Sequence, residues 1–225
     1  MFEIIPGILE KEWSEIEKKI EAAKSFTKSI HIDIIDGKFG QNATFIDPLP
    51  FKKFTSPSTG SGLFFELHMM VENPIQYLKP FADAGFKRFL GHVERMSDQA
   101  EFVATAQLLG EVGLAIDGPT DLSAIKVPYE DLDALLIMTI KAGESGQEFN
   151  PEYLKKVETF SANDPSTRLA RSGLVIEVDG GINDATIVEA KNAGATRFVA
   201  NSFIFNPSAG SGPYRQFNLL KKCLE

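Results

Sequence analysis

The sequence has little that would place the protein outside a reducing, aqueous compartment. Its single cysteine, Cys223, cannot form an internal disulfide or a paired-cysteine metal site, which fits a reducing environment. The chain contains no run of about 18 apolar residues, the length that a membrane helix needs. Its first residues lack the basic and apolar regions of a signal peptide. We therefore expect a cytoplasmic protein without a membrane span.

Excess positive charge is also absent. The chain has 23 lysine and arginine residues against 31 aspartate and glutamate residues, a net charge of −8. No basic stripe is available for nucleic acid or for an anionic membrane surface, so we expect neither as a partner. Any phosphate group must be held by a few local groups. No linker rich in Pro, Ser and Gly divides the chain, so residues 1–225 are expected to form a single domain.

The order of apolar segments predicts the fold. Short runs rich in β-branched and aromatic residues alternate with stretches whose apolar residues recur at helical spacing. This alternation favours a parallel sheet with helical crossovers, and eight such units are typical of an α/β fold, the closed (β/α)₈ TIM barrel. An open doubly wound sheet is disfavoured, because no GxGxxG follows the first predicted strand. The predicted strands are Phe2–Ile8, Ser29–Ile34, Leu63–Met69, Arg88–Val93, Gly113–Ile116, Ala134–Ile140, Leu174–Val178 and Arg197–Ala200.

Four polar residues lie near the ends of the predicted strands, where the active site of such a barrel lies. His31 and Asp33 are two residues apart in "HIDIID", so their side chains point to the same side of a strand. His68 ends "LFFELH" and Asp179 ends "LVIEVD". Two imidazoles and two carboxylates suit one divalent ion of zinc, iron, manganese or cobalt better than magnesium or calcium.

Each of these four residues taken alone is more often a hydrogen-bonded structural group. Together they favour a metal site, because two buried carboxylates near one another need a cation or a proton between them. His92, the third and last histidine, fits two roles equally well. It either contacts the substrate or pairs with Glu94 away from it.

Two segments that end the last two predicted strands and lead toward helices indicate a phosphate site. They are "VDGGIND", residues 178–184, and "VANSFIF", residues 199–205, and barrels often bind phosphate at these two positions. Gly180 and Gly181 allow the backbone to approach an anion with its N–H groups. A third loop, "KAGESGQ", residues 141–147, follows the sixth predicted strand. Each loop alone is a weak signal, because most glycines after strands only form turns.

From Ile5 to Phe205 the sequence resembles the ribulose-phosphate 3-epimerase family. The matching stretches are "HIDIIDGKFGQNATF", "ELHMMVENPIQYLKPFADAG", "GHVE", "LLIMTI" with "GESGQEF", and "VDGGINDATIVEAKNAGATRFVANSFIF". The resemblance implies that His31, Asp33, His68 and Asp179 bind one divalent metal. It also implies that the two aspartates exchange protons with the substrate.

The implied activity is the metal-dependent inversion of C3 in a ketose phosphate, D-ribulose 5-phosphate to D-xylulose 5-phosphate. This isomerase reaction belongs to the pentose phosphate pathway of carbohydrate metabolism. One aspartate would remove the C3 proton from one face, and the other would return a proton to the opposite face of a flat enediolate. A metal can stabilise that enediolate as a Lewis acid.

The sequence departs from the family pattern at several positions, and the departures concern the substrate rather than the metal. Gly7 replaces a serine that contacts substrate, Ile35 replaces a methionine, and Lys38 replaces a histidine. Glu144 puts an acid into the sixth loop, and Asn201 replaces a glycine, at a position where asparagine would tolerate a left-handed backbone. The residues expected to contact the substrate or its phosphate are His68, Gly143, Ser145, Gly146, Gly180, Gly181, Asn201 and Ser202, and those expected to line the site are Gly7, Ile35, Met70 and Met138.

The departures leave other activities open. An epimerase for a related sugar such as a hexulose 6-phosphate fits the altered substrate residues. A non-catalytic barrel that binds sugar phosphates is a second alternative, although it would have little need for two acids aimed at one carbon. An aldolase would need a Schiff-base lysine in a strand, and only Lys141, at a strand end, comes near this requirement. The sugar, the metal and the oligomeric state, including a homo-oligomer, remain open.

Overall fold

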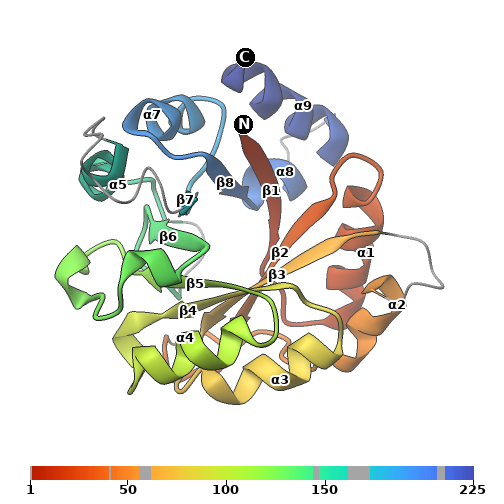
Figure 1. The fold of residues 1–225 in the computed structure, drawn as a ribbon. Coiled ribbons are helices and arrows are strands. Elements are labelled where there is room, and N and C mark those ends of the chain that lie inside the picture. Colours follow the sequence, from red (N-terminus) through yellow and green to blue (C-terminus); the bar gives the residue numbers. More distant parts are fainter. Residues whose placement is uncertain (1, 41, 56–61, 144–146, 162–172, 207–210) are drawn as a thin grey trace.

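The computed structural model describes residues 2–40, 42–55, 62–143, 147–161, 173–206 and 211–225. Within these residues, eight parallel strands close into a barrel in chain order, with helices around the outside (Figure 1). The strands are β1 Glu3–Ile8, β2 Ser29–Ile35, β3 Phe64–Met70, β4 Arg88–His92, β5 Glu111–Ile116, β6 Ala134–Met138, β7 Val175–Asp179 and β8 Arg197–Ala200. The structure confirms the predicted (β/α)₈ barrel, and no strand boundary differs from the prediction by more than two residues.

Helices and short 3₁₀ turns connect the strands. The helices are α1 Trp13–Ala23, α2 Lys52–Thr55, α3 Ile75–Asp83, α4 Gln99–Gln107, α5 Leu154–Ser161, α7 Thr186–Ala193, α8 Ser202–Phe205 and α9 Pro213–Leu224. Between β5 and β6 the described chain forms two 3₁₀ turns, η4 Leu122–Ala124 and η5 Tyr129–Asp131, in place of an α-helix. No helix in the described part of the chain is long and apolar enough to cross a membrane.

Apolar packing between the strands and the outer helices holds the barrel together. Phe51, Phe65, Phe81 and Phe86 are fully buried in this layer, and the rings of Phe81 and Phe86 meet edge to face with centroids 5.0 Å apart. Such aromatic contacts add to the free energy gained by burying apolar surface. Alternate residues of each strand face the other way, into the barrel, where a second and smaller apolar cluster that includes Leu90 and Leu136 shares the interior with polar side chains.

Candidate active site

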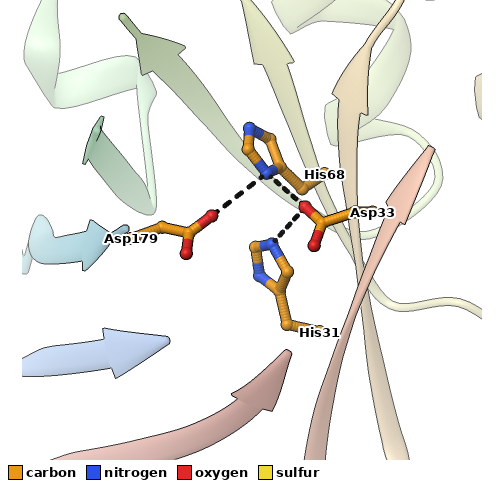
Figure 2. Close-up of side chains that lie close together, drawn as sticks. All are labelled: His31, Asp33, His68 and Asp179. Carbon is orange, nitrogen blue, oxygen red and sulfur yellow. Dashed lines mark hydrogen bonds and ion pairs between the residues drawn. The ribbon is translucent and has the colours of Figure 1, made fainter. Parts of the chain in front are cut away.

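The structure brings together the four residues that the sequence suggested as metal ligands. His31 and Asp33 come from β2, His68 from β3 and Asp179 from the end of β7 (Figure 2). The strand register places Asp33 directly beside His68. One nitrogen or oxygen atom from each of the four residues lies within 4.8 Å of the others.

Asp33 is at the centre of this group. Its Oδ1 atom lies 2.8 Å from Nδ1 of His68 and 3.2 Å from Nε2 of His31. Nδ1 of His68 is in turn 3.6 Å from Oδ2 of Asp179 (Figure 2). Both imidazoles are fully buried, whereas the side chains of Asp33 and Asp179 are 7% and 14% exposed. The acids therefore reach the cavity described below, and the imidazoles lie behind them.

The two aspartates differ in protonation. Burial raises the pKa of Asp33, but His31 and His68 lower it more strongly, so the pKa lies well below its ordinary value. Burial and the facing carboxylate of Asp33 raise the pKa of Asp179 to about 8. At neutral pH and without a cation, Asp33 is therefore ionised and Asp179 holds a proton. Two acids with such different pKa values suit a base and an acid of one reaction.

The donor set fits a divalent metal. Two imidazole nitrogens and two carboxylate oxygens converge, and a cation bound among them would offset the repulsion between the two acids. His31 can offer Nε2, because its Nδ1 faces Glu66 at 2.6 Å. His68 can offer Nδ1, because its Nε2 faces His92 at 2.8 Å. Fixing one ring nitrogen in this way orients the other toward a metal.

Glu66 and Glu177 form a buried acidic pair behind His31 that the sequence analysis missed. Glu66 also accepts a hydrogen bond from Nη1 of Arg88 at 2.5 Å, and Glu177 lies 3.6 Å from Nδ1 of His31. Burial raises the pKa of Glu66, but His31 and Arg88 lower it to about 2. Burial and the charge of Glu66 raise the pKa of Glu177 to about 7. Their spacing was a usable signal, because each stands two residues before a candidate ligand.

His92 pairs with Glu94, which is one of the two arrangements considered for it. It ends β4, is fully buried, and contacts His68 through Nε2. Its Nδ1 lies 3.0 Å from Oε2 of Glu94. It is absent from the described lining of the cavity and supports His68 from behind.

A cavity of about 320 Å³ opens at the carboxyl ends of the strands, next to Asp33 and Asp179. Its lining contains the following residues from the sequence prediction: Ile35, Met70, Met138, Gly143, Gly180, Gly181, Asn201 and Ser202. It also contains Leu9, Glu10, Lys19, Ile140, Gln147, Ile182, Val199 and Asn206. Ser145 and Gly146 lie outside the described residues.

Three of the departures from the family pattern are placed differently from the expectation. Gly7 is not among the described lining residues, because Val199 of β8 packs against it and leaves 2.8 Å between its Cγ1 and a Cβ built on Gly7. Lys38 forms an exposed ion pair with Glu72 at 2.9 Å and is not among the described lining residues. Asn201 has φ −104°, so it does not adopt the left-handed conformation suggested for it.

The turn after β7 does require glycine. Gly180 and Gly181 have φ angles of 117° and 66°, in a region of backbone conformation that residues other than glycine rarely adopt. A Cβ on Gly180 would lie 2.6 Å from Cγ1 of Ile140. The hydroxyl of Thr139 donates to the carbonyl oxygen of Asp179 at 2.9 Å. This turn therefore both orients Asp179 and brings bare backbone to the cavity wall.

Known proteins match this chain over most of its length. The ribulose-phosphate 3 epimerase family matches residues 3–205. The ribulose-phosphate 3-epimerase of Schizosaccharomyces pombe is 33% identical over 90% of this chain and 86% of its own length. That of Bacillus subtilis is 32% identical over 92% and 94%. The fold is shared with 3-hexulose-6-phosphate synthase from Salmonella typhimurium, at a TM-score of 0.68 and 12% identity over 99% of this chain and 98% of that one. The chain thus belongs to the ribulose-phosphate 3-epimerase family, a family of isomerases, as its motifs predict.

Proposed function

We propose that this protein is a metal-dependent epimerase that inverts C3 of a ketose phosphate, D-ribulose 5-phosphate to D-xylulose 5-phosphate. The observation that carries this proposal is the pair of acids, Asp33 and Asp179, which come from strands β2 and β7 and line the same cavity. Inversion at a carbon beside a ketone needs one group that takes a proton and one that gives a proton.

The two acids divide the proton transfers between them. In one direction the ionised Asp33 takes the C3 proton from one face of the sugar, and the protonated Asp179 gives its proton to the other face. The C3–H bond breaks on one side and a new C3–H bond forms on the other, so the substrate gains and loses one proton. After turnover Asp33 is protonated and Asp179 ionised, which is the starting state for the reverse direction.

His31, Asp33, His68 and Asp179 would hold one divalent ion of zinc, iron, manganese or cobalt, which when bound stabilises negative charge on the ketone and hydroxyl oxygens. The contact between Glu66 and Nδ1 of His31 keeps His31 oriented for this role, and Glu177 lies 3.6 Å from the same nitrogen. The buried side chains of Ile35, Met70 and Met138 form the apolar part of the cavity wall, beside the acids, and would exclude water from the flat intermediate.

The loops after β6, β7 and β8 would hold the phosphate. Gly143 and the turn of Gly180 and Gly181 offer backbone N–H groups, and Asn201 and Ser202 offer both backbone and side-chain groups. All five residues line the same cavity as the two acids, so a phosphate held there would place the sugar against Asp33 and Asp179.

Isotope exchange in deuterated water tests the two-acid mechanism. We expect Asp33→Asn and Asp179→Asn each to abolish epimerisation, because an amide cannot take or return a proton. Each variant should still exchange the C3 proton of one epimer, since one acid remains. Metal content is measured on each variant because both acids are proposed ligands. Asp83→Asn, an exposed change in α3, is the matched control and should behave as wild type.

The result that overturns the catalytic proposal concerns the wild type. If the fully metal-loaded protein neither exchanges nor inverts the C3 proton of ribulose 5-phosphate or of hexulose 6-phosphates, the protein is not an epimerase for these sugars. Inversion of a hexulose 6-phosphate alone would keep the mechanism and change the substrate.

A further inference from the structure

Lys19 is the one basic side chain among the described residues that line the cavity. It lies on α1, and its Nζ is 2.6 Å from Oε1 of Glu10 and 4.9 Å from the ring centroid of Phe205. Its side chain is only 12% exposed. The neighbouring Lys18 shows the contrast, because its side chain is 76% exposed and its Nζ lies 3.5 Å from the exposed Glu15. Lys19 is therefore held in the cavity wall, whereas Lys18 is solvated.

Lys19 lies at the end of the cavity where phosphate is expected to bind. Phe205 belongs to α8, the four-residue helix that follows Asn201, and Asn201, Ser202 and Asn206 line the cavity beside Lys19. The aliphatic stem of a lysine can pack on an apolar ring while its ammonium group stays with polar partners. The ammonium group of Lys19 thus lies within the part of the wall that β8 and α8 form.

The cavity wall is otherwise acidic, which gives the ammonium group of Lys19 a role in binding an anion. The charged lining residues other than Lys19 are all acidic: Glu10, Asp33 and Asp179. A phosphate monoester carries close to two negative charges at neutral pH, so these acids would repel it. The metal would offset Asp33 and Asp179 at one end, which leaves Lys19 to compensate the phosphate at the other.

We propose that Lys19 binds the phosphate of the sugar-phosphate substrate and that Glu10 competes with that phosphate for the ammonium group. This inference rests on the proposed function, because it takes a phosphate monoester as the ligand. In the ligand-free protein Glu10 holds Lys19 in the wall. When phosphate binds, Nζ of Lys19 turns part of its hydrogen bonding from Oε1 of Glu10 to the phosphate oxygens.

Opposite effects of two variants separate this role from a structural ion pair. If Lys19 and Glu10 only stabilise the wall, removing either partner should change phosphate binding in the same direction. If Lys19 binds phosphate and Glu10 competes, Lys19→Met should weaken binding about tenfold or more, the effect of losing a charged hydrogen bond. Glu10→Gln should instead tighten binding, about two- to fivefold, because the ammonium group is released from its partner.

The probe is inorganic phosphate, titrated by calorimetry into the metal-loaded protein, with Lys18→Met as the matched control on the same helix. Lys18→Met should bind phosphate as wild type does. Steady-state assays with ribulose 5-phosphate add a second measurement, in which Lys19→Met should raise KM with little change in kcat. Should Lys19→Met fail to fold, Lys19→Gln and Glu10→Gln provide the same comparison of signs.

The outcomes distinguish this inference from the proposed function. Wild type that epimerises ribulose 5-phosphate, with both variants weakened or both unchanged in phosphate binding, would overturn the role of Lys19 and leave the epimerase intact. Wild type that binds no inorganic phosphate would also overturn it. Opposite shifts in phosphate binding without turnover of any ketose phosphate would support Lys19 as an anion-binding residue while the epimerase proposal fails.

Discussion

Replacing Gly7 with serine, the residue that the family pattern has there, should destabilise this barrel. A Cβ on Gly7 would lie 2.8 Å from Cγ1 of Val199 and 3.5 Å from Cβ of Asn201. Val199 is 1% exposed and β-branched, so few rotamers are open to it and it cannot turn away without moving β8. Overpacking of this kind costs about 1–3 kcal/mol of unfolding free energy.

Urea unfolding of four variants measures this contact. Gly7→Ser should lower the unfolding midpoint by about 0.3–1 M, taking an m-value of about 3 kcal/mol/M for a chain of this size. Val199→Ala removes the methyl group that a serine Cβ would meet. The double variant should therefore be about 1–2 kcal/mol more stable than the sum of the single effects. Gly212→Ser is the control, because no atom lies within 4 Å of its added Cβ and its φ of −83° suits serine.

Additive effects of Gly7→Ser and Val199→Ala on stability would refute this reasoning. If Gly7→Ser unfolds at the wild-type midpoint, and Val199→Ala has the same effect with glycine or with serine at position 7, the side chain of Val199 does not determine which residue fits there. A loss of stability equal to that of Gly212→Ser would lead to the same conclusion, because it would reflect the glycine-to-serine change itself.

Three further predictions concern charged groups in the barrel. Between about pH 5 and pH 8 the metal-free protein should lose stability as the pH rises, because burial raises the pKa of Asp179 to about 8 and that of Glu177 to about 7, so the folded state keeps protons that the unfolded state has released. His31, whose pKa is raised, lowers stability with rising pH in the same way. Burial lowers the pKa of His68 to about 4, so His68 opposes this trend only below pH 6.5, the ordinary pKa of histidine. Urea midpoints that rise from pH 6.5 to 8 would therefore contradict this prediction. Protein purified without added metal should contain one divalent ion per chain by elemental analysis, and His31→Ala with His68→Ala should remove it, whereas full occupancy in that double variant would place the ion elsewhere. Glu66→Gln should lower the free energy of unfolding in urea by about 3–5 kcal/mol, because it breaks a buried ion pair with Arg88. Glu111→Gln changes the 44% exposed partner of the same arginine and should cost less than about 1 kcal/mol, so equal costs would contradict this prediction.

The sequence by itself determined the barrel and the four residues at its centre. The alternation of β-branched runs with helical spacing predicts eight strands, because covalent geometry sends alternate side chains of a strand to opposite sides whatever surrounds it. The same rule places His31 with Asp33. It also applies to Glu66 with His68 and to Glu177 with Asp179, and the sequence analysis did not use it there. The family motifs supplied the order in which these strands contribute to one site.

Only the tertiary structure decided which distant groups touch each other. Asp33 and Asp179 are the same residue type, and burial raises the pKa of both. The pKa of Asp33 nevertheless falls because this acid faces two imidazoles, whereas the carboxylate of Asp33 raises the pKa of Asp179 further. Val199 against Gly7 and Lys19 beside Phe205 depend on how β8 lies next to β1 and how α1 packs near α8. Such contacts join residues far apart in the chain, and closure of the barrel sets their distances, so no local spacing in the sequence reports them.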